Sequence, residues 1–379
     1  MIPDRPNVFA FCPHPPDWRL DWDGIVAAFP WVEAMRGVPQ EPKYHAEGDV
    51  LTHVHLVCEA LVSLPAWRGL DDADRAILFA AALFHDAGKP GRTVSEGGHV
   101  TSLGHSRLSA SLARDYFWQA GADLKTRETT AALVRSHGLP LQFLDREDPD
   151  RLLTGFSFRG RCDHLALLAE ADVLGRVCED VPDLLARLEL FREECKALGC
   201  WDQTYQFPSD LSRVQYFATP GRDRTYPAYD DTVCEVVLMS GLPASGKDTW
   251  ITRNVPDLPV VSLDALREEL GVSPKGDQAK VVAEARLRAK KLLRERRSFV
   301  WNATNVTLQI RRPLTEALTA QRARVRIVYL EAPWDETVRR NAARPSPVPL
   351  SVMENMRWRL EVPDLTEAQR VEWIETAES

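Results

Sequence analysis

The sequence predicts two domains of different fold class: an all-α domain over residues 1–225, then an α/β domain with a parallel sheet over residues 226–379. The length of 379 residues already favours two or three domains, because a single hydrophobic core rarely grows that large. Apolar residues recur at helical spacing over residues 48–198, whereas short β-branched runs alternate with helical stretches after residue 232. Residues 217–232 lack periodicity and are rich in Pro, Gly, Asp and Tyr, which is typical of a domain boundary.

The individual elements follow from the same spacing. In the first domain, helices are expected over residues 50–64, 73–84, 106–118, 126–136 and 164–177. In the second, strands are expected over residues 235–239, 259–263, 298–301 and 325–330, and helices over residues 246–253, 278–296, 308–321 and 334–343. Strands that alternate with helices form a parallel sheet covered on both faces, and such sheets bind ligands at the carboxyl ends of their strands.

Composition indicates a soluble protein of a reducing compartment, and we expect it to be cytoplasmic and without a membrane partner. The N-terminus lacks the pattern of a secretory signal, and the longest apolar run, residues 76–84, is about half a membrane span. The seven cysteines are scattered and include no C-x-x-C pair, so we expect reduced thiols and neither disulfides nor a zinc site.

The charge distribution suits a short nucleic-acid contact. A formal net charge of −8 argues against a protein that coats nucleic acid over a long footprint. Between residues 265 and 344, however, Lys and Arg outnumber Asp and Glu by about two to one, which suits an enzyme that grips a short stretch of strand. Solvated basic helix faces are the alternative explanation.

The first strand of the second domain leads into a loop with the pattern G-x-x-x-x-G-K. Backbone N–H groups of such a loop surround a nucleotide phosphate, and its lysine reaches the β and γ phosphates. We therefore predict that this loop binds ATP or another NTP together with Mg²⁺; a glycine-rich turn with a lone lysine is the alternative. The residues assigned to it are Gly241, Ser245, Gly246, Lys247, Asp248 and Thr249.

Position 248 departs from the usual pattern, which has Ser or Thr after the lysine as the Mg²⁺ ligand. A carboxylate beside ATP phosphates is repelled unless a cation lies between them, so we predict that Asp248 binds Mg²⁺ directly. Asn302 ends the third strand, where a carboxylate often assists the metal, and its neutrality suggests that the carboxylate has moved to the loop. Thr249 as the metal ligand is the competing interpretation, although it is rotated by about 100° around the helix.

Further candidate residues follow the second strand and a later helix. Asp264 is placed to accept a proton from an attacking hydroxyl as general base; capping the next helix is an alternative, compatible role. Arg340 and Arg344, four residues apart, share a helix face and suit a lid that clamps the transferring phosphates, with a plain basic helix end as the alternative.

The loop GLPASGKDTW, the pair Asp264-x-x-Arg267, the segment NATN and the lid Arg340-N-x-x-Arg344 together resemble the 5′-OH polynucleotide kinase of bacteriophage and bacterial RNA-repair systems. The resemblance covers about residues 234–363. It implies that Asp264 is the general base on the 5′-OH, that Arg267 contacts a phosphate of the acceptor strand, and that the lid arginines contact ATP phosphates. Residues 352–360 also resemble the family's helix near the nucleobase, with core packing as the alternative.

The first domain contains a His85-Asp86 dipeptide at the end of a predicted helix. Imidazole and carboxylate groups are the ligands that divalent first-row metals prefer, and an aspartate next to a histidine can bridge two ions. We predict one or two divalent transition metals, such as Mn²⁺, Ni²⁺ or Co²⁺, and expect His45 to contact a substrate phosphate. The predicted ligands are His53, His85, Asp86, His105, His137 and Asp172.

The segments HAEGDVLTH, ALFHDAGKP, LGHSRLSASLA, VRSHGLP and AEADVLGR closely resemble the HD domain attached to bacterial tRNA nucleotidyltransferases, over roughly residues 44–176. The resemblance implies that Lys89 binds phosphate and that the domain hydrolyses 2′,3′-cyclic phosphates and 2′ or 3′ monophosphates. It also implies a first metal at His53, His85, Asp86 and Asp172 and a second at His105 and His137.

An HD domain followed by a 5′-OH kinase resembles the bacterial HD-Pnk family, whose proposed role is RNA end healing. The expected substrates are therefore RNA or DNA termini, and a separate RNA ligase is a possible partner. Two alternatives stay open. One is a nucleotide-metabolism enzyme with a small-molecule P-loop kinase and an HD nucleotide phosphohydrolase; the other is a regulatory module whose HD domain only binds a nucleotide.

Overall fold

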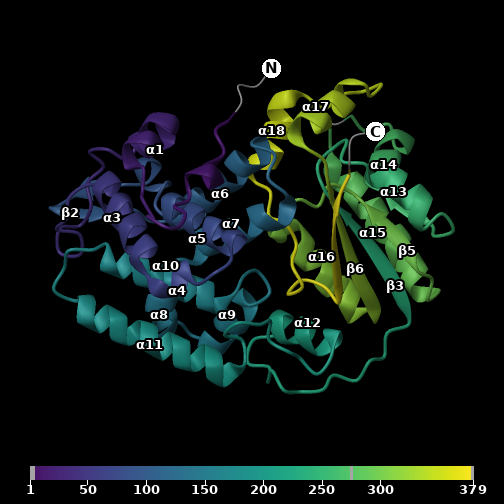
Figure 1. Cartoon of the computed structure of the whole chain (residues 1–379). Helices are drawn as coiled ribbons and strands as arrows, with labels where there is room; N and C mark the ends of the chain where they lie inside the picture. Colours follow the sequence, from purple (N-terminus) through teal and green to yellow (C-terminus); the bar gives the residue numbers. More distant parts are fainter. Residues whose placement is uncertain (1–4, 274–275, 377–379) are drawn as a thin grey trace. The chain divides into compact units, whose positions relative to one another are not determined.

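The computed structural model describes residues 5–273 and 276–376, which divide into two compact units, Met1–Gln206 and Phe207–Ser379 (Figure 1). The first unit is helical and the second combines helices with a parallel sheet, so the predicted fold class is confirmed. The units divide ahead of the boundary expected at residues 225 and 226. The reason is helix α12 (Asp210–Ala218), because its Arg213 donates hydrogen bonds to the carbonyl oxygens of Leu365 and Gln369, both at 2.8 Å.

The first unit contains the five predicted helices and several shorter ones. Its long helices are α3 (Val50–Ser63), α5 (Asp72–Phe84), α6 (His105–Gln119), α7 (Leu124–Ser136), α10 (Cys162–Leu174) and α11 (Val181–Leu198). The shorter ones are η1 (Val8–Phe11), α1 (Trp22–Ala28), α2 (Pro30–Glu33), α4 (Pro65–Arg68), η2 (Lys89–Gly91), α8 (Leu139–Gln142), η3 (Phe143–Asp145) and α9 (Pro149–Phe156).

The helical unit also contains one hairpin that the helical spacing did not predict. Strands β1 (Val94–Glu96) and β2 (His99–Thr101) pair antiparallel, and Glu96 lies opposite His99. The two residues between them, Gly97 and Gly98, have φ of 59° and 83°, which glycine adopts without steric cost. A Gly-Gly pair is therefore the sequence signal for this turn.

Aspartate side chains fix the start of the helices that carry the first candidate site. Asp49 accepts a hydrogen bond from Thr52 N ahead of α3, and Asp71 and Asp123 cap α5 and α7 in the same way. Helix α3 packs against α5 and α10 through fully buried residues such as Val54, Leu78 and Leu168. One hydrophobic core thus holds together the helices from which the polar site residues project.

The second unit is a five-stranded sheet in the order β4-β5-β3-β6-β7, with every neighbouring pair parallel. Its strands are β3 (Cys234–Ser240), β4 (Val260–Ser262), β5 (Phe299–Asn302), β6 (Ala323–Glu331) and β7 (Arg370–Glu375). Besides α12, its helices are α13 (Lys247–Asn254), α14 (Leu263–Glu269), α15 (Gln278–Arg294), α16 (Leu308–Ala320), α17 (Trp334–Ala342) and α18 (Leu350–Trp358). The first four strands were predicted, and β7 was not.

Alternate residues of the central strands serve two separate cores. Val236 and Leu238 of β3 belong to one buried cluster, and Val237 and Met239 belong to another. Because both faces are covered, the strand is apolar from Val236 to Met239 and shows no alternation with polar residues over that stretch. Strand β3 is therefore central, and the loop that follows it opens at the carboxyl edge of the sheet.

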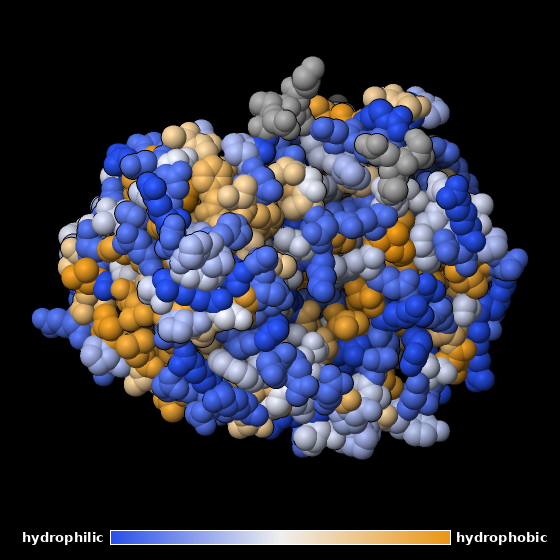
Figure 2. Space-filling model, viewed as in Figure 1, coloured by the Kyte–Doolittle hydropathy of each residue, from blue (hydrophilic) through white to orange (hydrophobic). Residues whose placement is uncertain are grey.

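Figure 2 shows that hydrophilic side chains cover most of the face in view and are interspersed with smaller hydrophobic areas. None of the helices that the structure describes has both the length and the apolar content needed to cross a lipid bilayer.

Candidate functional site

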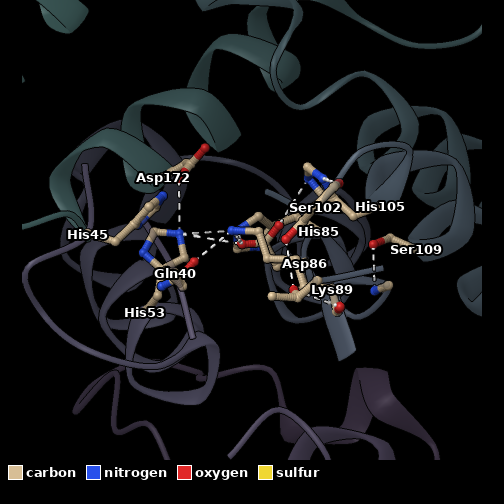
Figure 3. Close-up of polar contacts among 12 residues, drawn as sticks. Gln40, His45, His53, His85, Asp86, Lys89, Ser102, His105, Ser109 and Asp172 are labelled. Atoms are coloured by element: carbon tan, nitrogen blue, oxygen red, sulfur yellow. Dashed lines mark hydrogen bonds and ion pairs between the residues drawn. The ribbon is translucent and has the colours of Figure 1, made fainter. Parts of the chain in front are cut away.

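The six residues predicted as metal ligands lie together in the helical unit, and Figure 3 labels all of them except His137. Nε2 of His53, on α3, lies 3.1 Å from Oδ1 of Asp172, on α10, and 3.4 Å from Nε2 of His85. His85 is the C-cap of α5, and its Nε2 lies 3.3 Å from Oδ2 of Asp86. On the other side of that carboxylate, Nε2 of His105 lies 3.3 Å from Oδ1.

Backbone carbonyls orient three of the four histidines in one repeated pattern. Nδ1 of His85 donates to the oxygen of Ala82 at 2.7 Å. His105 and His137 bond in the same way to the carbonyl three residues earlier, at 2.8 and 2.9 Å. Nδ1 of His53 lies 2.9 Å from a carboxylate oxygen of Glu47. Since a carbonyl only accepts, Nδ1 carries the proton and Nε2 presents its lone pair to the centre.

With these tautomers, the lone pairs of several ligand atoms face one another at the centre of the cluster. Nε2 of His85 is an acceptor, and Nε2 of His53 lies 3.4 Å from it and 3.1 Å from Oδ1 of Asp172. Oδ1 of Asp86 is buried without a hydrogen-bond partner in the described part of the chain. Acceptors that face one another in a buried space repel unless a cation or added protons lie between them. The donor set therefore fits a divalent metal.

The ligand atoms form two groups that share one carboxylate. His53, His85 and Asp86 make the first group, and Asp86, His105 and His137 make the second; within each, the atoms lie within 4.8 Å of one another. All but His105 are buried. Burial lowers the pKa of His137 to about 4, and burial also lowers the pKa of His105. Both rings are neutral at pH 7, which is the form that binds a metal.

Charged neighbours hold the two buried aspartates in their ionised form. Nζ of Lys89 lies 2.6 Å from Oδ2 of Asp86 and donates to Oε1 of Gln40, also at 2.6 Å. Nη2 of Arg176 donates to Oδ2 of Asp172 at 2.8 Å. Burial is the largest single effect and opposes ionisation, but Lys89 or Arg176 together with the neighbouring histidines outweighs it and keeps the pKa of both carboxyl groups well below the usual range.

Glu47 and Arg176 are site residues that the sequence analysis did not assign. The carboxylate of Glu47 lies between Nδ1 of His45 at 2.8 Å and Nδ1 of His53, and it also accepts from Val177 N. Both residues stand within the motifs HAEGDVLTH and AEADVLGR. Glu47 also joins segments far apart in the chain, because it accepts from Val177 N, whereas Arg176 contacts Asp172 only four residues earlier.

The structure places the remaining histidines outside the cluster. His55 stacks on Trp22 with ring centroids 4.4 Å apart, and His164 lies 3.5 Å from Asp74. His99 lies on β2, 3.6 Å from Glu41. His45 is the exception, because its ring centroid is 4.7 Å from that of His53. Its predicted role as a phosphate contact stays a prediction.

In the α/β unit, the phosphate-binding pattern forms the turn between β3 and α13. Gly241 is required there, since a Cβ atom would lie 2.3 Å from the carbonyl oxygen of Leu330. Gly246 has φ of 95° as the N-cap of α13, while Ser245 is buried inside the turn. Nζ of Lys247 donates to the carbonyl oxygens of Gly241 and Leu242 at 3.0 and 2.7 Å, which satisfies the ammonium group at the mouth of the loop.

Asp248 and Asn302, predicted to share the Mg²⁺ region, are hydrogen-bonded. Nδ2 of Asn302 donates to Oδ1 of Asp248 at 2.7 Å. The pairing joins the first turn of α13 to the end of β5, because parallel neighbouring strands finish at the same edge. Thr249, the competing ligand, also lies in the first turn of α13 and is exposed.

The predicted general base and the arginines also lie near Lys247. Burial lowers the pKa of Lys247 to about 8. The negative charge of Asp264 raises this pKa, and the positive charge of Arg344 lowers it. Asp264 is 72% exposed and pairs with Nη1 of Arg267. The helix-capping role considered for Asp264 is wrong, since Ser262 caps α14 by accepting from Ala265 N.

Arg340 is held against the phosphate-binding turn by a residue that the sequence analysis missed. Its Nη1 donates to Oγ1 of Thr376 at 2.9 Å, and the same hydroxyl lies 3.4 Å from the carbonyl oxygen of Ser245. Its Nε donates to Glu336, one turn earlier in α17. A Cβ atom on Gly246 would lie 3.9 Å from Nη1 of Arg340, so the guanidinium is next to the turn.

Comparisons with known proteins agree with this division of the chain. A family described as HD domain matches residues 50–173, and a family described as AAA domain matches residues 236–363. The Multifunctional CCA protein of Thioalkalivibrio sulfidiphilus is 32% identical over 169 residues, which cover 43% of this chain and 39% of that protein. The Multifunctional CCA protein of Acidovorax sp. (strain JS42) is 27% identical over 172 residues, covering 42% and 37%.

This chain therefore spans little more than a third of the length of the curated relatives it matches. A crystal structure from Chloroflexus aurantiacus covers 38% of this chain and 86% of its own, with 18% identity and a TM-score of 0.33. Together, the folds and family matches describe an HD domain followed by a P-loop kinase-like domain.

Proposed function

We propose that the chain heals broken nucleic-acid ends, with RNA as the main substrate. In this proposal the α/β unit transfers a phosphoryl group from ATP or another NTP, bound with Mg²⁺, to a 5′-OH end. The helical unit removes 2′,3′-cyclic, 2′ or 3′ phosphate with divalent ions such as Mn²⁺, Ni²⁺ or Co²⁺. A separate RNA ligase would then find the 3′-OH and 5′-phosphate ends that ligases usually require.

The observation that carries the proposal is the position of Asp264 in the same chain as a complete HD cluster. Its carboxylate is exposed and pairs with Arg267, and its negative charge raises the pKa of Lys247. A hydroxyl that approaches the γ phosphate would therefore meet a base, and a neighbouring strand phosphate would meet Arg267. Arg340, on α17, and Arg344 would bind the ATP phosphates, although Arg344 does not share the predicted helix face because α17 ends at Ala342.

In the helical unit, His53, His85, Asp86 and Asp172 would hold one metal, and Asp86, His105 and His137 a second. Divalent ions bound there supply an activated water for attack on phosphorus. The chain itself orients each imidazole through Nδ1 and keeps Asp86 and Asp172 ionised. Lys89 places an ammonium group beside Asp86, where it would bind a phosphate oxygen.

The decisive experiment gives the full chain an RNA that carries a 5′-OH and a 2′,3′-cyclic phosphate, together with ATP and a panel of divalent cations. Both ends are then analysed, and we expect both to be converted. Unchanged ends would refute the proposal. Phosphorylation of free nucleosides in preference to the RNA would favour the nucleotide-metabolism alternative.

Single variants separate the two activities. We expect His85→Ala to lose metal-dependent hydrolysis and keep the kinase, and Asp264→Asn to do the reverse. His55→Ala is the matched control, because His55 lies on α3 with His53 but stacks on Trp22 outside the cluster. A His85→Ala variant with undiminished hydrolysis would leave only the regulatory interpretation of the HD domain.

A further inference from the structure

Three cysteines from separate segments meet in the core of the helical unit. Cys162 is the first residue of α10, Cys195 lies in the last turn of α11, and Cys200 follows that helix. Their Sγ atoms lie within 4.8 Å of one another, and all three residues are 0% exposed. Within the described residues, none of the other four cysteines joins such a group. The fold thus creates a thiol cluster that the sequence spacing did not predict.

Backbone hydrogen bonds fix the positions of these sulfur atoms. Gly199, with φ of 72°, turns the chain after α11, and Cys200 N then donates to Cys195 O at 2.9 Å. The next residue ties this turn to α10, because Asp163 N donates to Trp201 O at 2.9 Å. The three side chains therefore converge without help from a bound ligand, as the ligands of a preformed site do.

We propose that Cys162, Cys195 and Cys200 bind a soft cation with a filled d shell, Zn²⁺ or Cu⁺. Thiolates are the preferred ligands of these ions, with metal–sulfur distances of about 2.3 Å. That length places sulfur atoms about 3.8 to 4.0 Å apart in tetrahedral or trigonal geometry. Such separations are compatible with the limit of 4.8 Å that the three atoms satisfy.

Binding converts three thiols into thiolates and releases three protons to solvent, with no change of oxidation state. The site then carries one net negative charge with Zn²⁺ and two with Cu⁺, and a buried charge is costly. The positive end of the α10 dipole, where Cys162 lies, reduces this cost. The smaller charge favours Zn²⁺, with a small ligand such as water in the fourth position.

Simple core packing is the competing explanation, because buried cysteine often behaves as a small apolar residue. Hydrogen bonds among the three thiols, together with burial, raise the pKa of Cys162 and Cys195, so without a cation these two thiols are neutral. The two explanations differ in what they predict for added metal: packed thiols bind none, whereas a cation site takes one equivalent. Occupancy would fasten the start of α10, the helix that carries Asp172, to the end of α11.

The test is an anaerobic Co²⁺ titration of the reduced full chain. We expect thiolate-to-Co²⁺ charge-transfer absorption whose limiting intensity corresponds to one sulfur-bound ion per chain. The histidine and aspartate centre takes up further Co²⁺, but its ligands contain no sulfur and cannot produce this band. Added Zn²⁺ or Cu⁺ should then abolish the band, and the ion that does so at the lower concentration is the preferred cation. No band in the reduced wild-type chain overturns the proposal.

Matched variants decide which sulfur atoms are responsible. Cys195→Ala should abolish the band, whereas Cys58→Ala should keep it, since Cys58 is equally buried but stands outside the group. An unchanged band in Cys195→Ala contradicts the assignment. If that variant does not fold, X-ray absorption on the Co²⁺-loaded wild-type chain replaces it. Sulfur neighbours at about 2.3 Å support the site, and a shell of nitrogen and oxygen alone refutes it.

Discussion

Asp248 and Asn302 are hydrogen-bonded neighbours at the phosphate-binding turn. The carboxylate belongs to the loop and the amide to the strand, and the 2.7 Å hydrogen bond between them fixes the carboxylate at the mouth of the phosphate-binding turn. Only one of the two carries a negative charge. If both positions carried a carboxylate, the pKa of one of the two carboxyl groups would be raised. One acid paired with one amide gives the same local charge whichever position carries the acid.

Exchanging the two residues tests this interpretation. We expect Asp248→Asn to lower the kinase rate by about 10- to 100-fold and to raise the Mg²⁺ concentration needed for half-maximal activity. Adding Asn302→Asp should restore much of the rate, because a carboxylate again faces the ion. Hydrolysis of 2′,3′-cyclic phosphate in the same samples is the control. An active Asp248→Ser variant with unchanged Mg²⁺ dependence would contradict a metal-binding role.

Lys247 predicts how nucleotide binding depends on pH. Its pKa is lowered from 10.5 to about 8 by burial, so the free protein loses this charge as the pH rises through 8. ATP phosphates favour the protonated form, and binding above pH 8 must therefore take up a proton. We expect constant affinity for a non-hydrolysable ATP analogue below pH 7 and weaker binding above pH 8. Calorimetry in buffers of different ionisation enthalpy measures the uptake; none at pH 8.5 would refute this.

The sequence was sufficient for residues whose chemical type is itself the signal. His53, His85, Asp86 and the loop Gly241 to Asp248 stand in patterns with few other uses, and the structure brings each set together. Glu47, Arg176 and Thr376 were missed because each acts only by contacting another site residue: His53 for Glu47, Asp172 for Arg176 and Arg340 for Thr376. A residue that acts only by contacting another site residue produces no periodic pattern in the sequence.

Strand β7 is the element that links the sheet edge to the phosphate-binding turn. It pairs with β6 from Arg326 opposite Arg370 to Glu331 opposite Glu375, and Arg326 forms two hydrogen bonds with Glu372, both at 2.9 Å. The residue after the strand is Thr376, whose N–H donates to Glu331 O at 2.7 Å. That bond places the threonine hydroxyl between Arg340 and the turn.

Thr376 is therefore expected to act as a positioning residue for Arg340. Thr376→Val keeps the shape but removes the hydroxyl, and we predict a kinase kcat about 10-fold lower with a similar KM for the RNA acceptor. Thr376→Ser should retain most of the activity. The hydrolase activity of the same preparations reports on folding. Equal kinase rates for the valine and serine variants would show that the hydroxyl is dispensable.

The elements found from sequence were those with a long apolar repeat. Helices α3, α5 and α10 and strand β6 each contain several buried residues at regular spacing. Strand β7 instead reads Arg-Val-Glu-Trp-Ile-Glu and lies at the edge of the sheet, where polar residues are tolerated and the apolar signal is weak. The β1–β2 hairpin is only three residues a side and fully outside the core, so tertiary packing contributes no signal there.

At the scale of the whole molecule, each unit has its own core and its own candidate site. Within the residues that the structure describes, the helical unit holds a large apolar cluster, and the α/β unit has apolar clusters on both faces of its sheet. Helix α12 belongs with the second unit although its sequence precedes the predicted boundary. Arg213 is buried there, where it satisfies backbone oxygens ahead of β7.

The position of α12 predicts which fragments fold. We expect residues 1–206 to keep the hydrolase and residues 207–379 to keep the kinase. A fragment that starts at residue 226 loses α12 with the buried Leu211, Arg213 and Val214, which should cost several kcal/mol and lower Tm by about 10 °C. Calorimetric melting of the two kinase fragments measures the difference. Equal Tm values would place the domain boundary where the sequence suggested it.

The bonds from Nδ1 of His85, His105 and His137 to carbonyl oxygens have a genetic consequence. A backbone oxygen is present whatever side chain its residue carries, so no point substitution at Ala82, Ser102 or Val134 deletes it. Deep mutational scanning of the HD domain should therefore show sharp intolerance at the ligands and much milder effects at the half-buried Ser102. At the fully buried Ala82 and Val134, where packing also matters, only conservative substitutions should be mild. Among the four histidines, His53 is the one whose Nδ1 is oriented by a side chain, that of Glu47. A point substitution of Glu47 can therefore remove this contact.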